Sequence, residues 1–188
     1  MNQHPAYRKI CRVFLYYKVL LMVHSLRYDA DMEREVPQMQ KCMVILMGLQ
    51  GSGKSTFYHQ YLKDSFRRVN LDTLKTRHRE ELLIRDCLKQ NFSFAVDNTN
   101  PTIADRGRYI PLAREHGYRV IGYFMESKLQ DCIARNALRF GKERIPTAAI
   151  AATSNKLEMP SYREGFDELY FVSNDGKQMT ISEWREAE

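Results

Sequence analysis

Short apolar runs alternate with helical periodicity along most of the chain. The runs are five or six residues long, as expected for strands buried on both faces of a parallel sheet. Between them, apolar positions recur three and four residues apart, which is typical of helices packed on such a sheet. The pattern predicts an α/β fold with a central parallel five-stranded sheet and helices on both faces. The expected strands are 42–47, 67–71, 92–96, 119–124 and 167–172. The expected helices are 56–62, 73–90, 101–116 with a bend near Pro111, one opening with a capping box at Ser127, and 147–157, while 178–188 forms either a hairpin or a helix.

A glycine-rich loop follows the first expected strand. Residues 48–55 read Gly-Leu-Gln-Gly-Ser-Gly-Lys-Ser and fit G-x-x-x-x-G-K-[ST], the phosphate-binding loop (P-loop) of nucleoside triphosphatases. Successive backbone N–H groups of such a loop point at phosphate oxygens, and the following helix begins behind them. The loop therefore predicts a three-layer P-loop NTPase fold. The nucleotide-binding residues expected are Gly48, Gly51, Ser52, Gly53, Lys54, Ser55 and Thr56, with Lys54 on the β- and γ-phosphates and Ser55 on magnesium.

Carboxylates follow the second and third expected strands. The carboxyl ends of parallel strands are where open α/β sheets bind ligands. Asp72 has two possible roles there, as the N-cap of the next helix or as a general base that accepts a proton from an attacking hydroxyl. Asp97 matches the loose second motif of P-loop proteins, whose Asp helps to hold magnesium. We therefore expect Ser55 and Asp97 to be the magnesium ligands.

Arginines are spaced for a lid after the fourth expected strand. Arg135 and Arg139 are four residues apart and share one helix face, and Arg144 follows shortly after. Phosphoryl transfer spreads negative charge over three oxygens, which arginines stabilise. We interpret residues about 135–158 as a lid that closes over ATP, with Arg135 and Arg139 as catalytic residues and Arg139 also on the nucleotide. The alternative is a pair of solvent-facing arginines.

The charge distribution bears on the class of substrate, and the cysteine content bears on the compartment. The net charge is +6, with eight Lys/Arg against five Asp/Glu in residues 63–89 and nine against five in 101–145, whereas 150–188 hold four against eight. A basic surround of the P-loop suits a polyanionic substrate, although a solvated mixed surface explains it equally well. The four cysteines are far apart and form no C-x-x-C pair, which favours buried thiols in a reducing, cytoplasmic compartment.

Residues 1–40 differ from the rest of the chain. Their apolar stretch is broken by Lys18 and is shorter than the about 20 residues needed to span a bilayer. Basic residues precede this stretch, but no small-residue cleavage site follows it. We expect an N-terminal extension over 1–40, which is either a helical segment packed on the domain or a leader that is not part of the fold, before a P-loop domain over 41–188. Met32 and Met39 are alternative starts, and we expect no membrane association and no obligate protein partner.

From about Met43 to Val172 the chain resembles the kinase domain of polynucleotide kinases, including the kinase half of polynucleotide kinase/phosphatase enzymes. The P-loop alone is shared by many families, but the order of the matching pieces is far more specific. No Asp-x-Asp-x-Thr phosphatase motif is found in the chain. The matching pieces are Gly-Leu-Gln-Gly-Ser-Gly-Lys-Ser-Thr-Phe (48–57), Val-Asn-Leu-Asp-Thr-Leu (69–74), Asp-Asn-Thr-Asn-Pro (97–101), Ala-Arg-Asn-Ala-Leu-Arg-Phe (134–140) and Ser-Tyr-Arg-Glu-Gly-Phe (161–166).

The resemblance implies transfer of the γ-phosphate of ATP, with Mg²⁺, to the 5′-hydroxyl of a DNA or RNA end, in work such as nucleic-acid repair. It implies that Asp72 is the general base, that Asp97 and Asn98 belong to the acceptor side, and that Arg139 contacts the transferring phosphate. The family often has Arg just before the catalytic Asp or three residues after it, and here these positions are Leu71 and Lys75. Lys75 is therefore expected to bind the acceptor as a point charge. Two alternatives stay open, a kinase of a small hydroxylated molecule or nucleoside, and a nucleotide-binding regulatory ATPase.

Overall fold

A computed structural model describes residues 40–176 and 178–186. The chain divides into two units, Met1–Gln40 and Lys41–Glu188. The N-terminal extension expected over 1–40 lies outside the described residues apart from Gln40. In the part that the structure describes, no helix is long and apolar enough to cross a membrane.

The described residues of the second unit form one six-stranded sheet in the order β2-β3-β1-β4-β5-β6. The first five strands are parallel, as the apolar runs predict, and β6 is antiparallel to β5. The C-terminal segment therefore adds a hairpin strand, the first of its two expected forms. The strands are β1 (Cys42–Met47), β2 (Arg67–Val69), β3 (Phe94–Asp97), β4 (Arg119–Met125), β5 (Glu168–Asn174) and β6 (Met179–Glu183).

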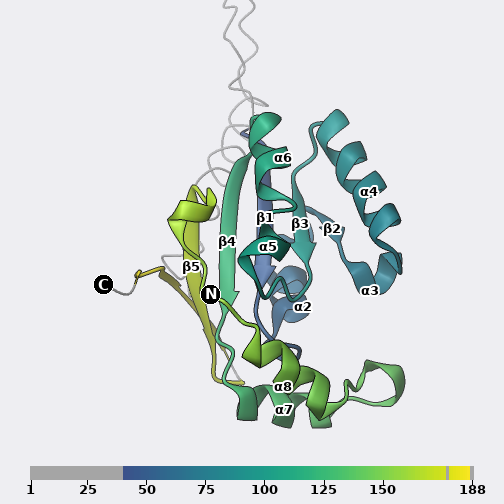
Figure 1. The fold of residues 1–188 in the computed structure, drawn as a ribbon, viewed down its shortest axis with the longest axis vertical. Helices are drawn as coiled ribbons and strands as arrows, with labels where there is room; N and C mark the ends of the chain where they lie inside the picture. The colour runs from purple at the N-terminus through teal and green to yellow at the C-terminus, as the bar shows by residue number, and fades with distance from the viewer. Residues whose placement is uncertain (1–39, 177, 187–188) are drawn as a thin grey trace, which may run out of the picture. The chain divides into compact units, whose positions relative to one another are not determined.

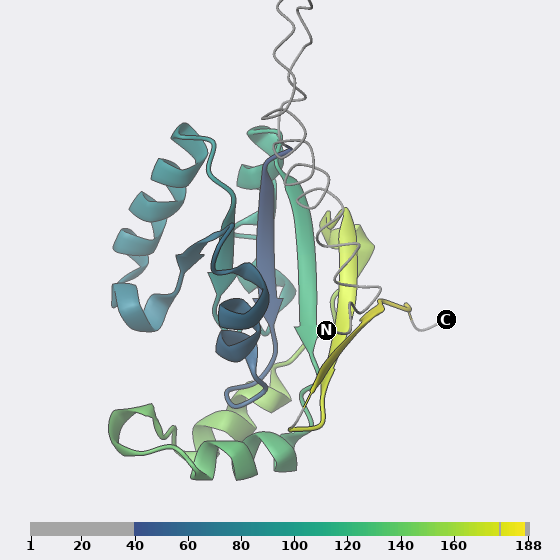
Figure 2. The same cartoon turned by 180° about the vertical axis from the view of Figure 1, so that it is seen from behind.

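Helices cover both faces of the sheet, so the fold is the three-layer arrangement predicted. Helices α5 (Ile103–Arg106) and α6 (Ile110–Glu115) lie in front of the sheet in Figure 1, and α2 (Lys54–Phe57) lies on the opposite face in Figure 2. Helix α2 continues as one π-helical turn, η1 (Tyr58–Leu62). Helices α7 (Leu129–Ala137) and α8 (Thr147–Asn155) lie together beyond the lower ends of β1 and β4 (Figure 1).

Strand β1 is central because all six of its side chains are apolar and buried. On one face Met43, Ile45 and Met47 join a core with side chains of α6 and of α4 (Arg77–Lys89). On the other face Phe57 of α2 packs against Tyr123 of β4, with ring centroids 4.8 Å apart. Burial of each such large apolar side chain contributes about 1.5–3 kcal/mol. This packing holds the carboxyl end of β1, and so the start of the glycine loop, in one place.

The helix expected over 73–90 is wrong as a single element. It is divided into α3 (Leu71–Leu74) and α4, because Lys75 adopts a left-handed conformation with φ 71° and ends α3. Thr76 then caps α4, its side chain accepting a hydrogen bond from the N–H of Arg79 at 3.2 Å. Asp72 consequently lies on a short helix of its own.

Two other helix boundaries also differ from the prediction. The helix expected over 101–116 is two helices, α5 and α6, and α5 begins after its cap Thr102 rather than at Pro101. Ser127 does not cap α7, since its hydroxyl donates to the Met125 carbonyl at 2.7 Å and accepts from the N–H of Leu49 at 3.0 Å. Ser127 therefore ties β4 to the glycine loop.

Candidate active site

The glycine loop is a tight turn between β1 and α2. Gly48, Gly51 and Gly53 all have φ between 83° and 132°, the left-handed region in which other residues are strained. A Cβ at Gly51 would lie 2.5 Å from the carbonyl oxygen of Cys132 on α7. The loop can therefore take this shape against α7 only with glycine at position 51.

Lys54 is held inside this turn. Its side chain is buried, with 9% of the residue exposed, and Nζ donates to the carbonyl oxygens of Gly48 at 2.9 Å and Leu49 at 2.7 Å. Burial lowers the pKa of Lys54 from 10.5 to about 8, and Asp97 acts against this shift. The loop thus keeps a desolvated amine at the place where the motif puts the phosphates.

Ser55 and Asp97 lie side by side where magnesium is expected. The Ser55 hydroxyl donates to Asp97 Oδ2 at 3.2 Å, and Asp97 is buried at the end of β3 with 2% exposed. Arg68 of β2 bonds both: its Nε donates to Asp97 Oδ2 at 2.8 Å and its Nη2 to Ser55 Oγ at 2.8 Å. A hydroxyl and a carboxylate are hard oxygen donors of the kind that Mg²⁺ prefers, so the pair fits this ion. The described residues hold no group of three or more His, Cys, Asp and Glu that could bind a metal. Phosphate and water oxygens would have to complete the shell, as is usual for Mg²⁺.

Asp72 lies in the first turn of α3 and is exposed. Its expected alternative role as a helix cap is wrong, because the cap is Asn70, whose side chain accepts from the N–H of Thr73 at 3.1 Å. Asn70 also donates to the carbonyl oxygen of Asp97 at 2.6 Å, which fixes the start of α3 to the end of β3. The negative charge of Asp72 opposes only weakly the burial that lowers the pKa of Lys54.

Asn98 and Lys75 lie at the two ends of α3, Asn98 bonding its first residue and Lys75 following its last. The Asn98 side chain accepts from the N–H of Leu71 at 2.9 Å, so this expected acceptor-side residue supports α3. Lys75 is exposed and keeps a left-handed φ although it has a side chain, a conformation that costs about 1 kcal/mol or more. Such strain at a residue beside a candidate site is a reason to look for a function.

The two lid arginines are placed differently. Arg135 packs on the P-loop, with Nε donating to the Gly51 carbonyl at 2.8 Å and Nη1 to the Asn174 carbonyl at 3.3 Å. Arg139 follows the end of α7, and its charge lowers the pKa of Lys54. Arg135 therefore supports the loop, whereas Arg139 lies near enough to act on its lysine. Their catalytic roles stay predictions.

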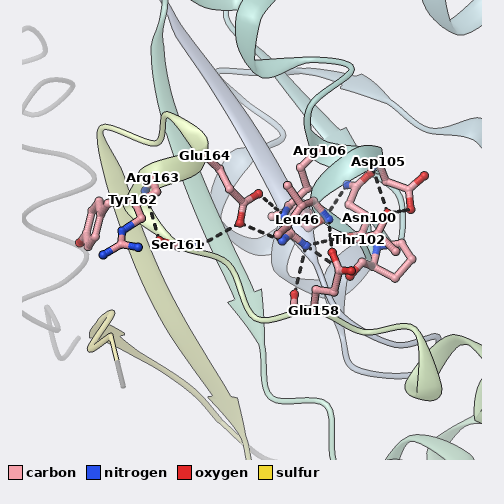
Figure 3. Close-up of polar contacts among 12 residues, drawn as sticks. Leu46, Asn100, Thr102, Asp105, Arg106, Glu158, Ser161, Tyr162, Arg163 and Glu164 are labelled. Atoms are coloured by element: carbon pink, nitrogen blue, oxygen red, sulfur yellow. Dashed lines mark hydrogen bonds and ion pairs between the residues drawn. The ribbon is translucent and has the colours of Figure 1, made fainter. Parts of the chain in front are cut away.

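A buried ion pair holds the segment after β3 against the segment that precedes β5 (Figure 3). Arg106 of α5 is fully buried and bonds Glu164 with both Nε (2.6 Å) and Nη2 (2.9 Å). The same guanidinium donates to the carbonyl oxygen of Asn100 at 3.2 Å, and the Asn100 side chain donates to the Leu46 carbonyl at 2.7 Å. Figure 3 shows these side chains converging between α5 and the 3₁₀ turn η3 (Tyr162–Glu164). Through Arg106, the segment Asp-Asn-Thr-Asn-Pro (97–101) is thus connected to the segment Ser-Tyr-Arg-Glu-Gly-Phe (161–166).

Three residues of this site were not predicted from the sequence: Asn70, Arg68 and the buried Glu80. Asn70 and Glu80 are ordinary polar residues of helix starts, so no local pattern marks them. Arg68 carried a signal, since a charged side chain in the middle of a short strand beside an acidic strand end needs a partner.

Comparison with known proteins agrees with this geometry. The sequence profile of the AAA domain family matches residues 43–160, which is more than half of the chain. The chain belongs to this AAA domain family. The match covers the glycine loop, Asp72, Asp97 and the lid arginines, and with the relatives below it shows a P-loop kinase domain.

The relatives also agree with the resemblance to polynucleotide kinases. A bifunctional polynucleotide phosphatase/kinase of Schizosaccharomyces pombe is 30% identical over 151 residues, 77% of this chain and 37% of that protein. A putative bifunctional polynucleotide phosphatase/kinase of Acanthamoeba polyphaga mimivirus is 29% identical over 141 residues, 71% of this chain and 34% of that protein. The chain therefore spans little more than a third of the length of these relatives.

Solved structures agree with the fold. Kti12 of Chaetomium thermophilum, in complex with ADP-AlF3, superposes with a TM-score of 0.58 at 14% identity, covering 72% of this chain and 91% of that one. A gluconokinase from Sinorhizobium meliloti 1021 has a TM-score of 0.51 at 15% identity, covering 70% and 82%. At these identities the likeness concerns the fold alone.

Proposed function

We propose that this AAA domain is an ATP-dependent 5′-hydroxyl polynucleotide kinase. The observation that carries the proposal is the fixed position of α3: Asn70 ties the start of this helix, which bears Asp72, to the end of β3, where Asp97 lies beside the P-loop Ser55. A base beside the phosphate site is what transfer to an alcohol requires, and simple binding of a nucleotide requires none. The names of the relatives favour a nucleic-acid end as that alcohol.

In this mechanism the 5′-hydroxyl oxygen attacks the γ-phosphorus of ATP. The bond between that phosphorus and the β–γ bridging oxygen breaks, ADP leaves, and the hydroxyl proton passes to an Asp72 oxygen. Lys54 and Arg139 balance the charge that develops on the phosphoryl oxygens. Bound to Ser55 and Asp97, Mg²⁺ would supply further positive charge to the phosphates.

The acceptor's own phosphate is assigned to Lys75, and the strain at this residue supports the assignment. We assign Asn98 and Asp97 to the acceptor side as well. Asn98 accepts from the N–H of Leu71, and the Asp97 carbonyl oxygen accepts from the Asn70 side chain, so both hold the start of α3. We place Arg135 among the groups that hold the P-loop, with any contribution to the transition state exerted through it.

The test is a panel of acceptors with γ-labelled ATP and magnesium: 5′-hydroxyl DNA, 5′-hydroxyl RNA, 3′-nucleotides and nucleosides. We expect label on the oligonucleotides, and we expect Asp72→Asn to abolish transfer while ATP still binds. Asp64→Asn, at an exposed carboxylate after η1, is the matched control and should transfer normally. Transfer to nucleosides but never to oligonucleotides would contradict the proposal. ATP hydrolysis without transfer to any acceptor, unchanged in Asp72→Asn, would favour a regulatory ATPase instead.

A further inference from the structure

Glu80 is a buried carboxylate in the first turn of α4, outside the P-loop. Only 3% of the residue is exposed. A buried charge is destabilising unless its oxygens are hydrogen-bonded and paired. Both oxygens of Glu80 are engaged: Oε2 accepts from Arg77 Nη1 at 2.7 Å, and Oε1 accepts from Asn98 Nδ2 at 2.7 Å and from the Tyr109 hydroxyl at 3.2 Å. The carboxylate is therefore held firmly from three directions.

The bond from Asn98 connects this carboxylate to α3. With its Nδ2 on Glu80, the Asn98 amide has only its Oδ1 side to present to α3, and Oδ1 accepts from the N–H of Leu71 at 2.9 Å. Leu71 is the first residue of α3, and Asp72 follows it directly. A flipped Asn98 amide would turn a donor toward the Leu71 N–H, and that bond would be lost. Glu80 thus determines which atom of Asn98 faces the helix that carries Asp72.

Helix α3 depends on such outside bonds. It is four residues long, far below the about 12–15 residues at which an isolated helix becomes marginally stable. The first N–H groups of any helix have no partner within it, and here Asn98 and Asn70 bond two of them. Without the Asn98 bond, the side chain of Asn70 would still bond the Thr73 N–H, but the Leu71 N–H would lose its bond to Asn98. The orientation of the Asp72 carboxylate should then become less well defined.

We propose that Glu80 is a positioning residue for phosphoryl transfer, which acts through Asn98 on α3 and so on Asp72. This inference rests on the proposed function, in which Asp72 accepts the proton. A base that is displaced by about 1 Å can reduce a rate about a hundredfold while substrate binding is preserved. The hydrogen-bond partners given above for Glu80, which are Arg77, Asn98 and Tyr109, all lie outside the nucleotide loop.

Two variants of Glu80 and one control variant distinguish a positioning role of Glu80 from a general loss of stability. Glu80→Ala removes the acceptor that orients Asn98, whereas Glu80→Gln keeps an oxygen for Asn98 and loses only the partner of the half-exposed Arg77. Cys87→Ala is the matched control, because Cys87 is fully buried on the same helix α4 and contacts α3 through none of these bonds. Thermal unfolding of each variant gives the loss of stability to compare.

Two readouts test the proposal. For Glu80→Ala we expect kcat to fall at least about tenfold with the KM for ATP changed less than about twofold, and the Leu71 amide to exchange its hydrogen faster. For Glu80→Gln we expect kcat within about threefold of the unmodified chain, with the slow Leu71 exchange restored. Cys87→Ala should lower the unfolding temperature and leave both readouts unchanged.

The outcomes that would overturn the positioning role differ from those that would overturn the proposed function. It is wrong if Glu80→Ala keeps normal kcat and slow Leu71 exchange, or if Cys87→Ala lowers kcat as much at an equal loss of stability. If the unmodified chain phosphorylates no oligonucleotide, the proposed function has failed, and the Leu71 exchange alone decides the positioning. Faster exchange in Glu80→Ala but not in Glu80→Gln or Cys87→Ala would then still support it, and equal exchange in all four proteins would refute it.

Discussion

Substitution of Lys54 with methionine measures the energetic cost of holding a buried charge in the P-loop. The pKa of Lys54 falls from 10.5 to about 8, chiefly through burial. A difference of about 2.5 between two pKa values corresponds to about 3 kcal/mol by which the folded state disfavours the charged amine. Methionine has nearly the same length and no charge, so this penalty disappears in Lys54→Met.

The sign of the pH dependence follows from the same two values. Because the folded-state pKa lies below the unfolded value, the unfolded chain binds more protons between about pH 8 and 10.5. The free energy of unfolding of the unmodified chain therefore rises across this window, and that of Lys54→Met lacks this rise. From pH 7 to pH 9.5 we expect the unmodified chain to gain about 2 kcal/mol relative to the variant. The bonds from Nζ to Gly48 and Leu49 are lost at every pH and shift the difference by a constant only.

Urea denaturation of both proteins at pH 7 and pH 9.5 checks this result. Lys63→Met, which makes the same change at an exposed position, is the control, and its difference from the unmodified chain should vary by less than about 0.5 kcal/mol between the two pH values. A stability difference for Lys54→Met that is independent of pH would refute the reasoning. Lys54 would then not be desolvated in the ligand-free loop.

Three further predictions concern other parts of the site. Arg106→Met leaves the buried Glu164 carboxylate unpaired, and we expect a loss of about 3–5 kcal/mol by urea denaturation, partly recovered when Glu164→Met is added. Gly51→Ala places a Cβ 2.5 Å from the Cys132 carbonyl oxygen, and we expect the Kd of a fluorescent ATP analogue to rise at least about tenfold. Arg68→Gln removes a competing cation from the expected magnesium donors, and we expect the magnesium concentration that half-saturates nucleotide binding to fall about tenfold in the same fluorescence titration.

Each of these has an outcome that would contradict it. An Arg106→Met chain as stable as the unmodified one would mean that Glu164 finds another partner. Unchanged nucleotide affinity in Gly51→Ala would mean that α7 moves away from the loop without cost. A higher magnesium requirement in Arg68→Gln would show that Arg68 orients the donors and does not compete with the ion.

The sequence predicted the large features of the fold because they depend on local patterns. Apolar runs such as 42–47 can be satisfied only inside a sheet, and glycines followed by Lys54 and Ser55 form a loop of known conformation. The predicted parallel sheet with helices on both faces was confirmed by the structure and by the family match. Helix boundaries were less well predicted, as at Lys75, since a left-handed lysine has no sequence signal.

The amino-acid sequence by itself determined the nucleotide loop, the acidic strand ends and the family, since these lie in contiguous residues whose chemistry is readable in one dimension. Only the tertiary structure decided which contacts hold them in place. Arg68 bonds both Ser55 and Asp97, and Glu80 accepts a hydrogen bond from Asn98. These contacts join residues that are 13 and 18 positions apart in the sequence. A hydrogen bond across the fold depends on how strands and helices pack, and that packing is set by the whole core and not by any one segment.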